Sequence, residues 1–552
     1  MVLALGQPPR IDPVSGIEIR VTAPVPEEVA SAGRRIARWT ELQQTTNAEK
    51  RVVLVYYNHP PGRHNIGADN LDVPQSLFEI LGRLEAAGYN VGSLPDSAEA
   101  LLEAIQERAV NLPENNEVLT DLWNAGLGYP SDPYNKWLQT LPSLTQAELV
   151  DGPLAALRIR VDTALGTQDV EVARESVDAA LHDMAFVIEG APARYHERAE
   201  ALLEQLKDAY AEHIDGQERG AILDELSRAL QNQGIEGLRG WGAVPGSVMT
   251  VGEDFVFPHL RFGNVVIAPQ PPRGWEVNEE VLHANLSVPP THQYLAFYHW
   301  LHSEFQPHAM VHLGRHSTYE FLPGKRVGLV STDYPRLVAG DIPGIYPYIV
   351  DGVGEGLQAK RRGLAVIVDH LTPPLQATPF YDELLALRQL VEGFESADPS
   401  RAGDIAREQA LQRIRAQVET LGIREALVAE LEAEHGGGER IEFDAIDPSL
   451  LVHEVGHFLT EMQEDFMPLG LHVFGRDWTE PALNTMLQSM GNESAREALA
   501  ASPSAEMNAL LAGLEGRFVA PGKGNDPLRS PDALPTGRNF FALDSSLIPN
   551  TV

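Results

Sequence analysis

The sequence predicts a multidomain α/β protein with doubly wound units, substantial helical insertions and a long, ordered C-terminal loop segment. Three short apolar runs are typical of buried strands: Arg51–Tyr57, Ala309–Val311 and Leu364–Val368. Polar or glycine-bearing sequence borders these runs, and helical patterns separate them, as in βαβ units. The length of 552 residues is sufficient for roughly two to four domains with cores of their own.

The amino-acid composition indicates a globular protein and excludes several other classes. With 43% hydrophobic and 22% charged residues, the chain is typical of a globular protein. It has no apolar run long enough to span a bilayer and no cationic signal region near Met1, so we expect a cytoplasmic protein. The absence of cysteine excludes disulfides and thiolate metal sites. A net charge of -36 argues against nucleic acid as a partner.

The N-terminal part is expected to contain one helix and then a βαβ unit. A helix is predicted over Pro26–Gln44, and the strand at Arg51–Tyr57 follows it. A loop rich in Pro, Gly and Asn leads to a second helix, Val73–Ala87, with leucines on one face. We expect the next element to begin at Asn90–Gly92.

The rest of the chain alternates helical and strand patterns. Residues 95–235 are expected to be largely helical, with Ala156–Val161 as a candidate strand. Two strands with a turn near Gly263 are predicted within residues 255–271, and an aromatic-rich helix at His292–His302. After residue 374 helices dominate, and the Pro/Gly-rich tail from Val519 is expected to be ordered over a cleft. The predicted divisions are residues 1–50, 51–240, 241–380, 381–500 and 501–552.

The stretch His308–Lys325 concentrates the candidate chemistry. His312 is placed at the carboxyl end of a strand, where ligands collect in α/β sheets. His316 and Glu320 have i, i+4 spacing, so one helical turn would place them on the same face. Two imidazoles and a carboxylate can bind a divalent cation or exchange protons, although the same spacing also fits a solvated helix face. A second polar run, residues 354–362, precedes the strand that ends at Asp369–His370, which predicts one shared cleft.

A different motif, H-E-x-x-H, occurs at His453–His457. In zinc proteases its histidines hold zinc and its glutamate, here Glu454, activates water, with Glu480 as a candidate third ligand. A solvent-exposed helix face explains the same residues, so the zinc protease is a remote alternative.

Several longer runs resemble the large subunit of the cobaltochelatase and magnesium-chelatase family. In the family's order, the matching runs are residues 58–77, 288–301, 311–325, 340–374, 468–475 and 520–544. The form of the early loop, PP-G-x-x-NIGA-x-x-L-x-VP, is more similar to the cobalt branch. The sequence departs from the family's H-x-G-T-H-G pattern at Arg315 and Ser317, and the chain resembles a shortened or partial member.

The resemblance implies insertion of a divalent metal into a tetrapyrrole. The cobalt branch inserts Co²⁺ into hydrogenobyrinic acid a,c-diamide in cobalamin biosynthesis, and the magnesium branch inserts Mg²⁺ into protoporphyrin IX. A carrier or dechelatase that does not insert metal is a further alternative. Because Gly324-Lys325 is followed by Arg326, no P-loop is present; the resemblance implies that separate AAA+ ATPase and integrin-like subunits hydrolyse ATP.

The resemblance also implies roles for individual residues. Glu320 is the expected base or metal-delivery carboxylate, with His312 and His316 as catalytic, metal-positioning ligands and His283 as a weaker metal candidate. A wider set is expected to bind the macrocycle and its acidic groups: Lys325, Glu355, Lys360, Arg361, Arg362, His370, Arg538 and Asn539. Ion pairing within the fold is the alternative role for these cations.

Overall fold

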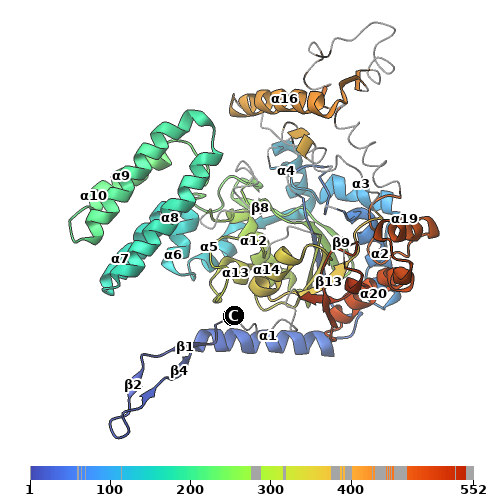
Figure 1. The fold of residues 1–552 in the computed structure, drawn as a ribbon, viewed down its shortest axis with the longest axis horizontal. Helices are drawn as coiled ribbons and strands as arrows, with labels where there is room; N and C mark the ends of the chain where they lie inside the picture. Colours follow the sequence, from blue (N-terminus) through green and yellow to red (C-terminus); the bar gives the residue numbers. More distant parts are fainter. Residues whose placement is uncertain are drawn as a thin grey trace.

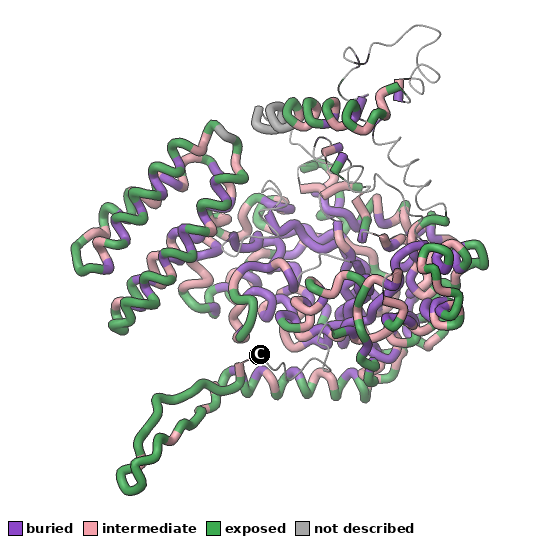
Figure 2. Tube along the Cα trace, in the orientation of Figure 1, coloured by how far each residue is buried: buried purple, intermediate pink, exposed green. Residues whose placement is uncertain are grey.

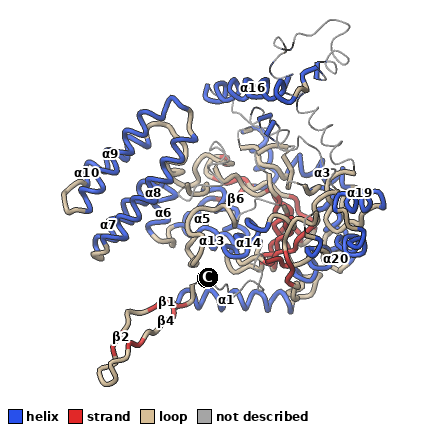
Figure 3. The backbone as a smooth tube through the Cα atoms, viewed as in Figure 1, coloured by secondary structure: helices blue, strands red, loops and turns tan. Residues whose placement is uncertain are grey.

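The computed structural model describes most of the chain. The described residues are 2–374 apart from 59–60, 64, 69, 114, 275–287 and 315–318; parts of 386–455, including 401–425; and 469–541 apart from 529. The expected α/β class is confirmed (Figures 1 and 3). None of the helices in this part of the chain has the length and apolar character needed to cross a membrane.

A six-stranded sheet forms the centre of the molecule. Its strands, in spatial order, are β13 (Val366–His370), β12 (Gly344–Ile349), β11 (Ala309–Leu313), β5 (Val52–Tyr56), β10 (Val265–Pro269) and β9 (Leu260–Phe262). All neighbours pair in parallel except β9, which forms an antiparallel hairpin with β10. This hairpin confirms the turn predicted near Gly263.

The order of the parallel strands defines where a ligand site is expected. Counted along the chain from β5, the parallel strands lie in the order 2-1-3-4-5, the flavodoxin-like arrangement. Chain direction across the sheet reverses between β5 and β11, and the carboxyl ends of these two strands form the topological switch point. Ligands of open α/β sheets bind in the crevice at such a point.

Both faces of the sheet are buried, which explains why the strands are continuously apolar. Val52, Leu54 and Tyr56 of β5 pack into one core, whereas Val53 and Val55 pack into the other. The first core includes side chains of α1 (Pro26–Gln44), α2 (Val73–Ala86), α3 (Ala98–Arg108) and α20 (Arg496–Leu514). The second includes side chains of α5 (Ser131–Leu138), α6 (Ser143–Val150), α12 (His292–Trp300), α13 (Tyr334–Ala339) and α14 (Val353–Gly363).

A helical group with a core of its own lies to one side of the sheet (Figure 1). It consists of α7 (Pro153–Gly166), α8 (Val170–Gly190), α9 (His196–Ile214) and α10 (Gly220–Gln231). The candidate strand at Ala156–Val161 was wrong, because these residues belong to α7. Leu154, Leu157 and Val161 recur at helical spacing and are fully buried against the neighbouring helices.

The remaining described elements are short or lie at the periphery. The small sheet contains β6 (Gly128–Pro130), β8 (Asp254–Val256) and β7 (Thr250–Val251); α4 (Asn116–Leu122), α16 (Arg401–Leu421) and α19 (Glu480–Met490) are additional helices. The expected element at Asn90–Gly92 was also wrong. This segment is a loop, and the next strand to join β5 in the sheet is β10, far along the chain.

The two ends of the described chain differ in exposure. An N-terminal arm, β1 (Ala4–Gly6), β2 (Arg10–Ile11), β3 (Glu18–Ile19) and β4 (Thr22–Pro24), projects from the body and is almost wholly exposed (Figure 2). By contrast, the C-terminal segment is ordered against the sheet up to residue 541, and the rest of the segment that was predicted to be ordered lies outside the described residues. Its strands β14 (Pro521–Lys523) and β15 (Asn539–Phe541) pair in parallel, and the Arg538 carbonyl accepts a 2.9 Å bond from the Asp369 N–H at the edge of β13.

Candidate functional site

The loop after β5 lies against the end of β11 at the switch point. Gly314, directly after β11, has a φ of +101°, and a Cβ there would lie 2.3 Å from the Ala68 Cβ. The backbone of the two segments therefore approaches more closely than a side chain would allow. Asn58 fixes the start of the loop, because its amide donates to the Gly62 and Asn65 carbonyls at 2.9 and 2.8 Å.

His312, predicted as a catalytic and metal-positioning residue, lies on β11 and is fully buried. The Tyr298 hydroxyl is 3.2 Å from its Nε2, and the Tyr319 ring packs edge-on at 4.8 Å. Nδ1 has no hydrogen-bond partner among the described residues. Burial lowers the pKa of His312 to about 3, so the imidazole is neutral at physiological pH. Neutral imidazole is the form that binds metal ions.

Glu320 and His312 both contact the same tyrosine, Tyr346. The Tyr346 hydroxyl donates a 2.7 Å bond to Glu320 Oε1, and the Tyr346 ring lies 5.9 Å from the His312 ring. Glu320 Oε2 is enclosed and has no partner among the described residues. Burial raises the pKa of Glu320 to about 7, although the Tyr346 bond and the charge of Arg273 act in the opposite direction. Such a carboxylate can accept a proton near neutral pH.

The conformation around Glu320 differs from the sequence prediction. Tyr319 and Glu320 lie in a turn and not in a helix. Arg362, which is fully buried, fixes this turn: its guanidinium donates to the carbonyls of Glu320, at 2.7 Å, and Leu322. His316 and His283, the other predicted ligands, lie outside the described residues. Within the described part of the chain, no three His, Asp or Glu side chains form a ready group for a metal ion.

The predicted substrate-binding residues are partly engaged in contacts of their own. Lys360 Nζ donates to the Phe540 carbonyl at 2.7 Å, Lys325 pairs with Asp333 at 3.2 Å, and Glu355 accepts from Tyr348 at 2.9 Å. These contacts are all within the protein. Asn539 Oδ1 accepts from the Ile367 N–H at 3.2 Å, whereas Arg361 is exposed on α14.

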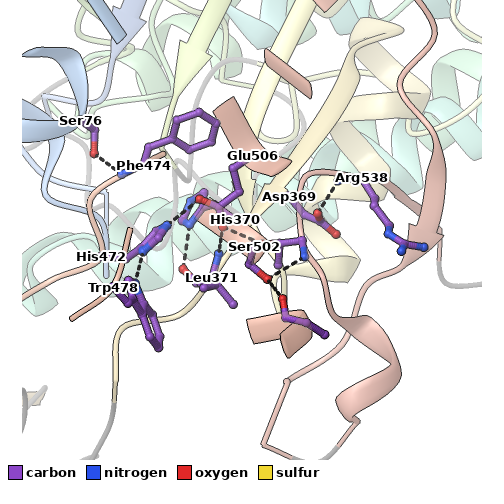
Figure 4. Close-up of polar contacts among 12 residues, drawn as sticks. Ser76, Asp369, His370, Leu371, His472, Phe474, Trp478, Ser502, Glu506 and Arg538 are labelled. Atoms are coloured by element: carbon purple, nitrogen blue, oxygen red, sulfur yellow. Dashed lines mark hydrogen bonds and ion pairs between the residues drawn. The ribbon is translucent and has the colours of Figure 1, made fainter. Parts of the chain in front are cut away.

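A second buried polar cluster surrounds the end of β13 (Figure 4). His370 stacks on His472 at 5.6 Å between ring centres. The Trp478 indole N–H donates to His472 Nδ1 at 3.1 Å, so His472 Nε2 carries the proton that it donates to Glu506 Oε2 at 2.8 Å. Glu506 Oε1 accepts from the Thr536 hydroxyl and the Leu371 N–H, at 2.7 and 2.9 Å. The cluster thus connects β13, α20 and the C-terminal segment.

The cluster also reaches the loop after β5. The His472 N–H donates to the Asn70 carbonyl at 3.0 Å, and the Asp72 N–H donates to the His472 carbonyl at 2.9 Å. Segments that were separate matching runs in the sequence therefore meet at the carboxyl edge of the sheet. A hollow lined by Glu41, Arg51 and His308 lies at the opposite edge, beside the amino ends of β5 and β11.

Two residues of the loop after β10 were missed by the sequence reasoning. Arg273 is buried, with its guanidinium carbon 5.8 Å from the centre of the Phe321 ring, and Gln270 is buried directly after the strand. The signal that could have identified them was their position, because both follow a buried strand at the carboxyl edge. Their burial was not visible in the sequence.

Together these features define an α/β protein with a buried imidazole of lowered pKa on β11 and a buried carboxyl group of raised pKa beside Tyr346 of β12. The sequence matches the family described as CobN/Magnesium Chelatase over residues 5–153, 172–503 and 492–552. The chain belongs to this family.

Individual relatives come from both branches. The chain is 28% identical to the magnesium-chelatase protein of the H type from Rhodobacter capsulatus, over 96% of this chain and 34% of that protein. It is also 28% identical to aerobic cobaltochelatase subunit CobN of Pseudomonas aeruginosa over 93% of this chain and 40% of that protein. The catalytic subunit of cobaltochelatase from Mycobacterium tuberculosis shares its fold, with a TM-score of 0.53 and 25% identity over 98% of this chain and 43% of that chain. The chain thus spans less than half the length of these relatives.

Proposed function

We propose that the chain forms the substrate-binding, catalytic core of a tetrapyrrole metal chelatase. The preferred reaction is insertion of Co²⁺ into hydrogenobyrinic acid a,c-diamide, with ATP hydrolysed by AAA+ ATPase and integrin-like partner subunits. Membership of the family supports the class of reaction. The single observation that carries the site is that Glu320 and His312 both neighbour Tyr346 and that each has an enclosed atom, Oε2 and Nδ1, without a partner among the described residues.

The chemistry requires a base and a place for the ion. As the cation enters, the macrocycle loses its inner N–H protons: one from a corrin, which binds the metal as a monoanion, and two from a porphyrin, the second of which passes to solvent. Glu320, with its pKa of about 7, accepts one such proton, while His312 supplies a neutral nitrogen donor to the incoming ion. The buried setting strengthens both interactions because little water competes.

Two alternatives share this site. Magnesium insertion into protoporphyrin IX is supported by similarity to magnesium-chelatase proteins of the H type, one of them 30% identical over 70% of this chain. A carrier or dechelatase would bind the macrocycle without ATP-dependent insertion. The form of the early loop favours cobalt over magnesium.

The test is an absorbance titration of the purified chain with metal-free corrinoid and porphyrin, followed by metal addition with and without ATPase partners. We expect tight binding of one macrocycle and insertion that requires the partners and is lost in Glu320→Gln. Glu148→Gln is the matched control, because Glu148 is also buried and accepts a 2.7 Å bond from a tyrosine, Tyr334, but outside the site. Binding without insertion under any condition supports the carrier, and binding of neither macrocycle contradicts the proposal.

A further inference from the structure

Arg273 is a buried cation beside the turn that carries Glu320. Arg273 is 7% exposed, and its NH1 atom is enclosed without a hydrogen-bond partner among the described residues. A guanidinium remains charged at any physiological pH, and burial of a charge without a hydrogen-bonded counter-ion is unfavourable. Among the described residues NH1 is thus left without a protein acceptor, which is typical of a residue that binds a ligand.

The surroundings of Arg273 place this donor beside the reaction centre. The guanidinium lies over the ring of Phe321, which directly follows Glu320, and its charge acts on the Glu320 carboxyl group. The loop that carries Arg273 is held from both sides: the Gln270 N–H donates to the Tyr56 carbonyl at 2.7 Å, and Thr291 Oγ1 donates to the Pro272 carbonyl at 3.0 Å. Arg273 is therefore held at the carboxyl edge next to the turn that carries Glu320.

Three other cations that were predicted to bind the substrate are already engaged within the protein. The buried Arg362 guanidinium donates to backbone carbonyls, Lys360 donates to the Phe540 carbonyl, and Lys325 pairs with Asp333. The hydrogen-bond donors of these three residues therefore bind groups of the protein itself. Arg273 combines burial, proximity to Glu320 and an NH1 that no described residue satisfies.

We propose that Arg273 binds a carboxylate side chain of the macrocycle and so fixes the position of the ring relative to Glu320. The inference rests on the proposed function and specifies which group of the substrate the protein recognises. Guanidinium groups bind carboxylates through two parallel hydrogen bonds, which fix orientation as well as distance. A carboxylate of the substrate would supply the hydrogen-bonded counter-ion that the described residues do not provide for NH1.

The experiment compares binding of a free acid with binding of its ester. Protoporphyrin IX and its dimethyl ester, and a corrinoid and its methyl ester, are titrated into the wild-type chain and into Arg273→Gln. We expect the wild type to bind the free acid about ten- to a hundredfold more tightly than the ester, and the variant to lose this preference. Arg261→Gln is the matched control, since the Arg261 guanidinium also lies 5.8 Å from a phenylalanine ring, that of Phe305, but Arg261 is exposed.

The outcomes separate the subsite from the proposed function. Tight binding of acid and ester alike by the wild type overturns the role of Arg273 and leaves the chelatase proposal standing. An equal loss for acid and ester in Arg273→Gln assigns Arg273 a structural role and also overturns it. Binding of no macrocycle by the wild type overturns both proposals. The acid-to-ester ratio of the wild type tests the inference even if the variant does not fold.

A second readout distinguishes binding from support of the fold. Because Arg273 is charged and no described residue satisfies its NH1, Arg273→Leu is expected to melt at the same temperature as the wild type or a few degrees higher. Weaker binding of the free acid together with unchanged or raised stability is the expected combination. A large drop in melting temperature would show that Arg273 mainly holds the fold.

Discussion

The hydroxyl of Tyr346 donates a 2.7 Å hydrogen bond to Oε1 of Glu320, while Oε2 of the same carboxyl group is enclosed without a partner among the described residues. One oxygen is thus fixed by the fold and the other is available to a ligand. Because Tyr346 lies on β12, the sheet itself sets the orientation of the candidate base.

Replacing Tyr346 by Phe is expected to raise the pKa of Glu320 further, because the lost bond stabilises the charged carboxylate. A charge-assisted hydrogen bond of about 2 kcal/mol corresponds to a shift of roughly one to two pH units. The rate of metal insertion should fall at pH 7 and recover at higher pH. Tyr348→Phe is the control, since Tyr348 donates to Glu355 instead; a pH profile that shifts equally in both variants would contradict the assignment.

Replacing Glu320 by Gln is expected to stabilise the folded chain at pH 8. Burial raises the folded pKa from its ordinary value of 4.5 to about 7, so the folded state retains a proton that the unfolded state releases. The stability of the wild type therefore falls as pH rises from 4.5 to 7, by about 3 kcal/mol in total. Glutamine does not ionise, so the variant does not lose this stability as pH rises.

The measurement is the difference in free energy of unfolding between Glu320→Gln and wild type at several pH values. The difference should be largest above pH 7 and should vanish toward pH 4.5. Glu506→Gln serves as the comparison, because the pKa of the buried Glu506 is lowered and its substitution should therefore change stability in the opposite direction. A Glu320 variant that is less stable than wild type at pH 8 would contradict this prediction.

Replacing Glu506 by Gln is expected to destabilise the fold by about 3 kcal/mol at pH 7. The Glu506 carboxylate accepts three bonds, from His472, Thr536 and Leu371, and a glutamine amide would place donor hydrogens against one of these donors. The interaction with His472 and the hydrogen bond from Thr536 hold the pKa of Glu506 below its ordinary value despite complete burial. Its contribution is therefore full above pH 4.5 and is lost as pH falls through the lowered pKa.

Thermal melting at pH 7 and at progressively lower pH tests this dependence on Glu506. The gap between variant and wild type should narrow as pH falls. Glu497→Gln, on the exposed face of the same helix, should melt with the wild type at every pH. An unchanged gap at low pH would show that shape and not charge accounts for the effect of the Glu506 substitution.

Replacing Gly314 by Ala is expected to weaken both stability and macrocycle binding. Its φ of +101° is unfavourable for alanine, and the new Cβ would meet Ala68 at 2.3 Å, so the loop after β5 must move. Gly324→Ala measures the cost of the backbone conformation alone, because Gly324 has a φ of +90° but open space around its Cβ position. The Gly324 substitution should cost about 1 kcal/mol and leave binding unchanged, whereas Gly314→Ala should cost more and reduce binding. If the two substitutions weakened binding equally, the close contact between Gly314 and Ala68 would not be the reason for the effect of Gly314→Ala.

Local patterns were sufficient to predict several elements. The helix Pro26–Gln44 begins at a proline, a residue favoured in the first turn, and its predicted bounds agree with α1. The apolar runs that form β5, β11 and β13 were recognised because each is buried on both faces and therefore lacks polar alternation. The candidate strand at Ala156–Val161 failed because a short apolar run does not distinguish a strand from a buried helix.

Contacts between distant segments decided the rest. The sequence singled out His312 and Glu320, but the turn around Glu320 depends on Arg362, and the position of Glu320 depends on Tyr346. His370 was recognised at the end of a strand, yet its stacking on His472 follows from the pairing of residues 70–72 with the segment that contains His472.

The sequence by itself thus determined which segments are buried, which family the chain resembles and which titratable residues follow the strands, because these properties depend on neighbouring residues along the chain. The tertiary structure decided the strand order, with β5 between β10 and β11, and the burial that shifts the pKa values of Glu320 and His312 in opposite directions. It also revealed Arg273 as a buried cation. The physical reason is that desolvation and hydrogen bonding depend on the neighbours that surround a group in space, and at this site most of those neighbours are far away in the sequence.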